Sequence, residues 1–236
     1  MRKLGEALKA VVSEAYDAET SAAPRGALMN ANRRRVFEHV AWHPCCTVAD
    51  VTRALRLSGA TAAWHLHKLV EAEYVNEVRV GRVGRYLASG LGLDPEEVAV
   101  LAALAHAISG QAFAIALTTP GLTAEELAGR LGRKSARRPL RALVAASLVV
   151  PVVDGRYRRY YPGPAVSTLE KNAGRRMRDF RRRLLRRLEG DRLAPQVRTA
   201  PGDVLEVDVV FGDERATMRL PMGSLLATRL GGVNLI

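Results

Sequence analysis

The chain has 236 residues, which is enough for one large domain or two small domains with ordinary hydrophobic cores. Its 36 lysine and arginine residues exceed its 24 aspartate and glutamate residues, giving a formal net charge of +12. This charge favours a polyanionic partner, with nucleic acid first and an anionic membrane surface second. No phosphate-binding loop, paired carboxylates or nucleophile beside a base is found, so we expect neither an enzyme nor a cofactor.

Residues 1–29 predict an arm that precedes the first domain. The chain starts with a charged amphipathic segment that lacks the apolar core and the cleavage site of a signal peptide. The apolar residues with helical spacing in the arm are Leu4, Leu8, Val11, Val12 and Ala15.

The two cysteines of the chain are Cys45 and Cys46. Adjacent cysteines seldom bond to each other, so no disulfide framework is predicted. We therefore expect a cytoplasmic protein.

The first domain is expected over residues 30–90, and its first helix over the run from Asn30 to Pro44. An asparagine at position 30 or 32 can cap this helix, and the proline ends it. Three arginines at positions 33–35 lie near its N-terminus, where positive charge opposes the helix dipole. A bound phosphate would reduce the unfavourable interaction between these positive charges and the helix dipole.

Histidine and cysteine gather near the end of this helix and offer a weak candidate metal or thiol site. His39 and His43 are four residues apart on one helix face, and Cys45 or Cys46 could complete a tetrahedral set. The spacing matches no common zinc pattern, and cysteine is often a buried structural residue. We therefore expect no metal, with this site as the alternative.

Residues 47–86 predict a helix-turn-helix followed by a β-ribbon. Two periodic runs are joined by a turn at Ser58-Gly59, and an extended segment begins at Tyr74-Val75. Valines then alternate with arginines around two glycines, as they do in a basic β-hairpin. This order is typical of a winged helix.

The second helix of this unit is the candidate DNA-reading element. If Ala62, Leu66 and Leu69 face the core, the opposite face can enter a major groove while the ribbon contacts phosphates or the minor groove. The alternative is a solvated face used for protein contact, but both elements are basic, which favours DNA. The candidate reading residues are Thr61, Trp64, His65, His67 and Lys68. The candidate ribbon contacts are Arg79, Arg82 and Arg85.

The segment from Thr61 to Val75, TAAWHLHKLVEAEYV, resembles the recognition helix of ArsR/MarR-like winged-helix transcription regulators. The resemblance is greatest to archaeal members, which carry a similar T-x-x-W-H-L-x-x-L-x-x-A-x-x-V pattern. It implies a winged-helix fold and a DNA-binding role. ArsR-like metal sensors usually place ligand cysteines on the recognition helix, and this helix has none.

The second domain is expected over residues 91–164 and starts with an uncharged run from Val98 to Thr118. By length alone this run could span a bilayer. It is rich in alanine, which contributes little to insertion, and polar residues interrupt its centre. We therefore expect two buried helices separated at Ser109-Gly110, preceded by a strong helix start at Asp94-Pro95.

Residues 123–161 repeat the pattern of the first unit, including a basic hairpin, and predict a second winged helix. Pro139 stands where the first unit has His65, which favours phosphate contact over base reading by the second recognition helix. The candidate DNA contacts of this unit are Lys134, Ser135, Arg137, Arg138, Arg141, Arg156, Arg158 and Arg159.

Residues 165–193 predict a basic amphipathic helix. Between positions 170 and 192, 10 basic residues face 4 acidic ones, which gives +6 of the +12 total. Its apolar seam predicts a homodimer contact, and the alternative is packing on the chain's own winged helices. The seam residues are Leu169, Ala173, Met177, Phe180, Leu184 and Leu188.

Residues 194–236 predict a small β-hairpin with a turn at Gly212-Asp213, which must pack on the helical body or on a second subunit. The expected fold is mainly α with small β-wings: two tandem winged helix-turn-helix domains, a basic linking helix and this hairpin. The expected function is a dimeric, sequence-specific double-stranded DNA-binding transcription regulator. The alternatives are a non-specific architectural or replication-associated DNA-binding protein and a membrane-anchored winged-helix regulator.

Overall fold

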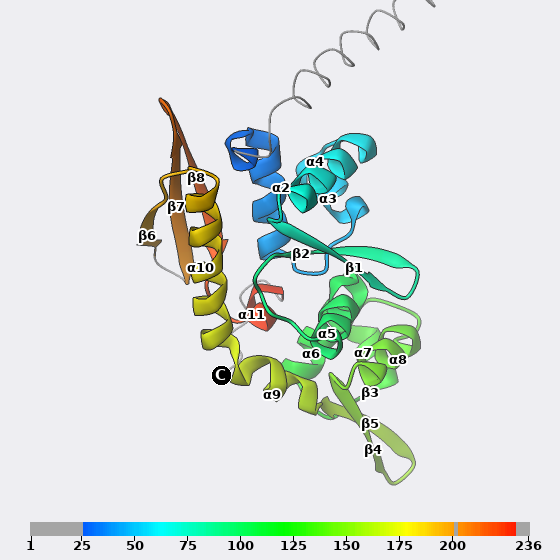
Figure 1. Ribbon diagram of the computed structural model, residues 1–236. Coiled ribbons are helices and arrows are strands. Elements are labelled where there is room, and N and C mark those ends of the chain that lie inside the picture. The colour runs from blue at the N-terminus through cyan, green and yellow to red at the C-terminus, as the bar shows by residue number, and fades with distance from the viewer. Residues whose placement is uncertain (1–25, 201–202, 230–236) are drawn as a thin grey trace, which may run out of the picture.

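The computed structural model describes residues 26–200 and 203–229 of the chain. The arm helix expected from Leu4 to Ala15 lies outside these residues. The described part forms two helical units, a long basic helix and a three-stranded sheet, all arranged around one continuous hydrophobic core (Figure 1).

The first unit consists of a short 3-10 helix, three α-helices and a hairpin. Its helical elements are η1 (Ala27–Met29), α2 (Ala31–Trp42), α3 (Val48–Leu55) and α4 (Gly59–Glu71). Its strands are β1 (Val75–Val80) and β2 (Val83–Ala88), which pair antiparallel. Asn30 caps α2 by accepting from the Arg33 amide at 3.0 Å, and Thr47 and Asp50 form a capping box at α3. These side chains satisfy backbone donors at the helix starts that the sequence predicts.

The second unit repeats the order of three helices and a hairpin, with an additional helix at its start and a short strand before its second-to-last helix. Its helices are α5 (Pro95–Ala105), α6 (Ala107–Thr118), α7 (Ala124–Arg130) and α8 (Arg137–Ala145). Its strands are β3 (Leu122–Thr123), β4 (Val149–Asp154) and β5 (Tyr157–Pro162), arranged in the order β3-β5-β4. Asp94 and Glu97 form a capping box at α5, which confirms the predicted helix start.

The uncharged run forms two helices, but the predicted position of the break between them is wrong. The chain turns at His106, and Ser109 and Gly110 lie inside α6. A Cβ atom at Gly110 would lie 3.0 Å from the Leu104 carbonyl oxygen, so this glycine allows the close approach at the bend. Among the described residues no single helix is long and apolar enough to cross a membrane. The pair α5 and α6 passes that test together but is bent by 98°.

The predicted basic helix is two helices, α9 (Pro164–Lys171) and α10 (Ala173–Gly190), separated at Asn172. Its apolar seam lies in the core of the same chain, so the predicted homodimer contact through this seam is wrong. Ala173 is partly exposed at the start of α10. The other seam residues are at most 4 % exposed: Leu169, Met177, Phe180, Leu184 and Leu188. The exposed stripe that the dimer would have covered therefore does not exist.

The C-terminal hairpin has a third strand that the sequence pattern did not indicate. The strands β6 (Gln196–Ala200), β7 (Val204–Phe211) and β8 (Glu214–Pro221) form an antiparallel sheet in that order, followed by α11 (Leu225–Arg229). Strand β8 lies against α2, where the Trp42 indole N–H donates to the Arg219 carbonyl at 2.9 Å and the Glu38 carboxylate accepts from the Arg219 amide at 2.7 Å. Side chains of α2 thus form hydrogen bonds with the main chain of β8, an edge strand of this sheet.

The contact between Glu38 and β8 predicts a pH effect on stability. Burial raises the pKa of the Glu38 carboxyl, and the bond from Arg219 and the charge of Arg34 oppose that shift. Because the pKa of Glu38 is higher in the folded state than in the unfolded state, its contribution to stability is present below the unfolded-state pKa. That contribution is lost as the pH rises through the folded-state pKa. Glu38→Gln keeps an acceptor oxygen without a charge. We therefore expect its stability relative to wild type to be higher at about pH 7 than at about pH 3.5.

Urea unfolding at both pH values measures this difference. Glu189→Gln is the matched control, because Glu189 is an exposed glutamate at the end of α10. A stability difference between Glu38→Gln and wild type that is the same at both pH values would contradict the prediction.

Candidate nucleic-acid interface

The outward face of α4 differs from the predicted one by a small rotation of the helix. Ala60, Ala63 and His67 are exposed, and Thr61 and Lys68 are partly exposed. The two alanines are not among the predicted reading residues, although the period counted from the buried Leu66 and Leu69 places them outward. Small side chains let a helix approach base edges closely, and alanine can contact a thymine methyl group.

His65 is wrong as a DNA-reading residue, because its side chain is only 4 % exposed. It lies three residues after Ala62 and four before Leu69, so it shares their buried face. Its ring packs against the edge of Trp64 with a centroid separation of 4.9 Å. His65 therefore belongs to the core of the first unit.

Trp64 joins α4 to α2. The Arg33 guanidinium lies 5.8 Å from the centroid of the indole, in cation–π contact, and leaves the ring partly exposed. Arg34 of the same cluster donates to the Leu28 and Met29 carbonyls at 3.0 Å. Two of the three arginines at the start of α2 thus have partners within the chain.

The remaining polar residues of α4 are held in place by each other. Lys68 donates to the Glu71 carboxylate at 2.8 Å, and His67 lies 3.0 Å from the other oxygen of that carboxylate. The bond from Lys68 lowers the pKa of Glu71. The Thr61 hydroxyl lies 2.7 Å from the Ser58 hydroxyl at the start of the helix. Thr61, His67 and Lys68 therefore remain on or beside the exposed face in defined positions.

The hairpin of the first unit presents two of its three predicted arginines. Arg79 and Arg82 are exposed, and Arg82 follows Gly81 at the turn. Arg85 is partly exposed and less available for phosphate contact, because its guanidinium donates to the Cys45 carbonyl at 2.9 Å. The Cys46–Tyr86 bridge brings this carbonyl next to β2, so Arg85 is directed into the unit.

In the second unit the exposed candidates are Lys134, Ser135, Arg137, Arg138, Arg141, Arg156 and Arg158. Arg159 is partly exposed and is engaged within the chain, because it donates to the Asp154 carboxylate at 2.6 Å and to the Gly121 carbonyl at 2.9 Å. The bond to Asp154 raises the pKa of Arg159. Pro139 is buried, as His65 is in the first unit, so the proline replaces no outward side chain. The expected weakening of base reading by Pro139 therefore has no basis in the geometry.

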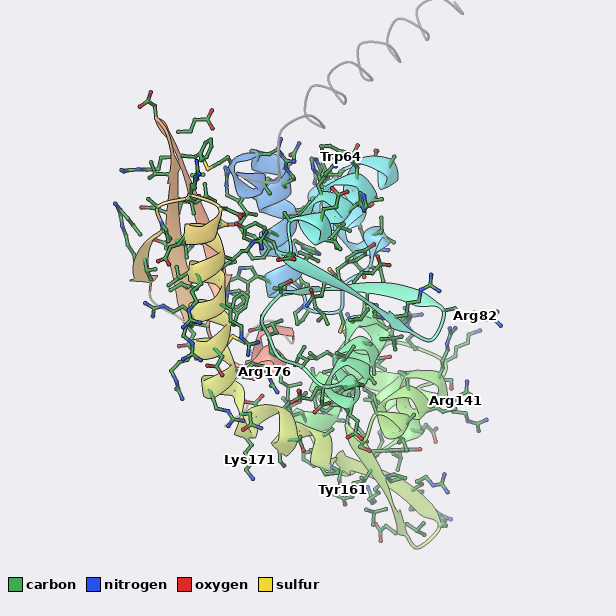
Figure 2. All side chains as sticks on the ribbon, in the orientation of Figure 1. Trp64, Arg82, Arg141, Tyr161, Lys171 and Arg176 are labelled. Atoms are coloured by element: carbon green, nitrogen blue, oxygen red, sulfur yellow. The ribbon has the colours of Figure 1, made fainter. Side chains whose placement is uncertain are left out.

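Helices α4 and α8 and the two hairpins lie on one side of the molecule (Figure 1). In Figure 1, α4, the β1–β2 hairpin, α8 and the β4–β5 hairpin occupy the right half of the view, whereas α10 and the β6–β8 sheet occupy the left. Figure 2 shows Arg82 and Arg141 along this right edge. We call the exposed cations of these four elements the first basic face: Arg79, Arg82, Lys134, Arg137, Arg138, Arg141, Arg156 and Arg158.

The histidines and cysteines of the candidate metal site do not converge. The His39 and His43 rings lie in tilted contact, with a centroid separation of 4.5 Å and an interplanar angle of 44°. Cys45 and Cys46 are buried, and the Cys45 sulfur lies 3.5 Å from the Val98 carbonyl of α5. Within residues 26–200 and 203–229, no three histidine, cysteine, aspartate or glutamate side chains form a group that could hold a metal ion.

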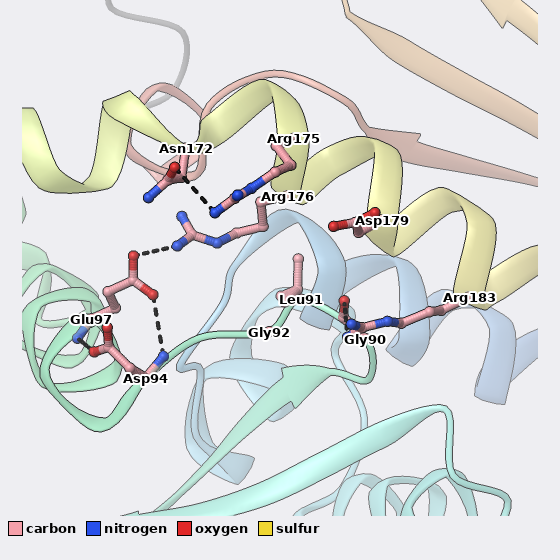
Figure 3. A pocket seen from close by; sticks show the side chains of 10 residues that line it. All are labelled: Gly90, Leu91, Gly92, Asp94, Glu97, Asn172, Arg175, Arg176, Asp179 and Arg183. Carbon is pink, nitrogen blue, oxygen red and sulfur yellow. Dashed lines mark hydrogen bonds and ion pairs between the residues drawn. The ribbon is translucent and has the colours of Figure 1, made fainter.

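Helix α10 fixes the linker between the two units (Figure 3). Arg176 forms a buried ion pair with Glu97 at the start of α5, and Arg183 donates to the Gly90 carbonyl at 3.2 Å. Nearer its C-terminus, Asp191 accepts from the Tyr74 hydroxyl at 2.7 Å, and this bond adds to burial in raising the pKa of Tyr74. The contacts of α10 with both units agree with the alternative expectation, that its seam packs on the chain's own winged helices.

A cavity of about 260 Å³ lies beside these contacts, between the linker and α10. Both carboxylates on the α5 side already have partners. Asp94 accepts from the Glu97 amide at 2.8 Å, and Glu97 accepts from Arg176 and from the Asp94 amide. The polar groups of this region therefore connect α10, the linker and α5 through hydrogen bonds and an ion pair.

Comparison with known proteins identifies the first unit. Residues 28–78 match a family model described as a helix-turn-helix domain. No curated protein matches the chain. Among solved structures, ScpB from Mycobacterium tuberculosis is similar with 13 % identity and a TM-score of 0.25, covering 59 % of this chain and 93 % of that chain. A TM-score this low supports no functional comparison. The chain therefore contains a helix-turn-helix domain at residues 28–78, comprising η1, α2, α3, α4 and the start of β1.

Proposed function

We propose that the protein is a sequence-specific, double-stranded DNA-binding transcription regulator with two tandem winged-helix units. The observation that carries the proposal is the helix-turn-helix domain at residues 28–78, whose α4 has an exposed face beside a basic hairpin. The repeated order of elements in the second unit and the common orientation of both hairpins support the tandem arrangement. The proposal includes no catalytic step.

The first unit would contact base edges and phosphates, and the second unit would contact phosphates. Helix α4 would enter the major groove, where Thr61, His67 and Lys68 can meet base edges. Arg79 and Arg82 would contact phosphates beside it, and the arginines of α8 and its hairpin would extend the backbone contact. Phosphate contacts would supply most of the affinity, and the few polar residues of α4 would supply discrimination.

A non-specific architectural DNA-binding protein is the second candidate. The observation that favours it is the composition of the interface: two alanines on the outward face of α4 and many arginines elsewhere. Selection of bound fragments from random duplex DNA, followed by sequencing, distinguishes the two candidates. An enriched sequence supports the regulator, and no enrichment supports the architectural protein.

A variant at His67 tests the proposed reading helix. We expect His67→Ala to lose about 1–3 kcal/mol of discrimination at one or two base positions of the selected site, with little change in binding to unrelated DNA. Binding to the selected site and to single-base variants of it measures this. His106→Ala is the matched control, because His106 is an exposed histidine between α5 and α6. Equal discrimination by the two variants would exclude His67 from base reading.

A further inference from the structure

The outer side of α10 carries a second basic surface, away from the first basic face. Arg175, Arg178, Arg182 and Arg186 are exposed, and their spacing of three and four residues aligns them along one side of the helix. At a rise of 1.5 Å per residue this line extends over about 17 Å. We call these four residues the α10 stripe. Lys171 at the end of α9 is also exposed.

The positive charge of the α10 stripe is mostly uncompensated. Within the described residues, the ion pair that involves the stripe is Arg182 with Asp179 at 2.6 Å, on the surface, where such pairs contribute little. Arg178 and Arg186 each lie four residues from Arg182, and like charges at that spacing destabilise a helix. A bound polyanion would remove this repulsion.

The stripe and the first basic face point to different sides of the protein. Figure 1 places α10 and the sheet of β6, β7 and β8 in the left half, and α4, α8 and both hairpins in the right half. The seam on the inner side of α10 is buried in the core, which orients the stripe outward. A straight duplex held by the first basic face is therefore not in position to reach the stripe.

The residue types of α10 indicate the backbone of a duplex as the ligand. Single-stranded nucleic acids bind by stacking on aromatic side chains, and the aromatic residue of α10, Phe180, is 1 % exposed. Arginine can contact guanine edges as well as phosphate, but α10 carries none of the amide and hydroxyl side chains that contact the other bases. A protein partner would use apolar or aromatic anchors, whereas Leu185 is the partly exposed apolar residue among these arginines. A surface made of arginine, without these other side chains, is suited to binding phosphate oxygens.

We propose that the α10 stripe binds the phosphate backbone of a second DNA duplex, so that one chain joins two duplexes. The inference rests on the proposed function for the first duplex only. Because the stripe consists of arginine alone, phosphate contacts would supply most of the affinity for the second duplex, which would be held with little sequence preference and with strong dependence on salt.

A two-duplex capture experiment tests this inference. One duplex of about 20 base pairs is fixed to beads, and a second, labelled duplex is captured through the full-length protein in low salt. We expect wild type to capture the label. Arg178→Gln/Arg186→Gln should bind the fixed duplex normally but lose roughly tenfold or more of the captured label, since each lost phosphate contact reduces affinity by about tenfold near 0.1 M salt.

The matched control removes two exposed arginines outside the stripe, Arg192→Gln/Arg215→Gln, and should capture as wild type does. Equal capture by the stripe variant and wild type would overturn the inference, as would displacement of the label by a single strand of equal phosphate number. Capture that depends on self-association, visible as dimers in light scattering, would also overturn it. Binding of the fixed duplex without capture refutes this inference alone, whereas no binding of the fixed duplex refutes the proposed function.

Discussion

Replacing Arg176 with methionine is expected to destabilise the protein by about 3–5 kcal/mol. The side chains of Arg176 and Glu97 are both 8 % exposed, and the arginine is the cationic partner of that carboxylate. Without the guanidinium, the Glu97 charge stays largely buried beside the linker and loses its cationic partner. The free energy of unfolding, measured by urea denaturation with circular dichroism, gives the size of the loss.

The double variant Arg176→Met/Glu97→Met should recover much of the stability, because it removes both charges and keeps similar volume. Arg175→Met is the control on the same helix turn. Since Arg175 is exposed and makes one contact of 3.4 Å with Asn172, we expect a change within about 0.5 kcal/mol. Equal destabilisation by Arg176→Met and Arg175→Met would show that the buried pair does not hold α10 to the second unit.

The second large effect is expected on DNA binding by the first hairpin. Arg79→Gln/Arg82→Gln should weaken binding to all sequences by a similar factor, roughly tenfold per lost contact near 0.1 M salt. The slope of log affinity against log salt should fall in magnitude by about 2, because each phosphate contact contributes about 1. Fluorescence anisotropy over a range of salt concentrations measures both quantities.

Arg85→Gln provides the contrast within the same hairpin. Its guanidinium donates to the Cys45 carbonyl, so we expect this variant to lose stability and to keep the salt slope of wild type. If the double variant kept the full slope, or if Arg85→Gln reduced it by the same amount, the tip of the hairpin would not be the part that contacts the backbone.

The sequence by itself determined the local elements of the fold. Helix starts are set by neighbouring residues, so the cap at Asn30 and the capping boxes at Thr47 and Asp94 follow from residue type and spacing alone. The buried face of α4 follows in the same way from the period of Ala62 and Leu66. The match of residues 28–78 to a helix-turn-helix family agrees with this pattern.

The tertiary structure alone decided which arginines are available to a partner. Arg82 and Arg85 are alike in the sequence pattern, but one lies at the turn and the other donates to a carbonyl 40 residues away. Arg159 and Arg176 are likewise held by Gly121 and Glu97, which lie far from them in the sequence. Sequence spacing carries no record of which distant carbonyl or carboxylate comes within hydrogen-bond distance.

The role of α10 was decided in the same way. Its spacing predicts an apolar seam on one side and positive charge on the other, and both are present. A seam that packs on a second chain and one that packs on its own chain have the same periodicity. The choice depends on whether the chain's own sheet and helices can cover the seam, and this becomes known only when all of these elements are placed together.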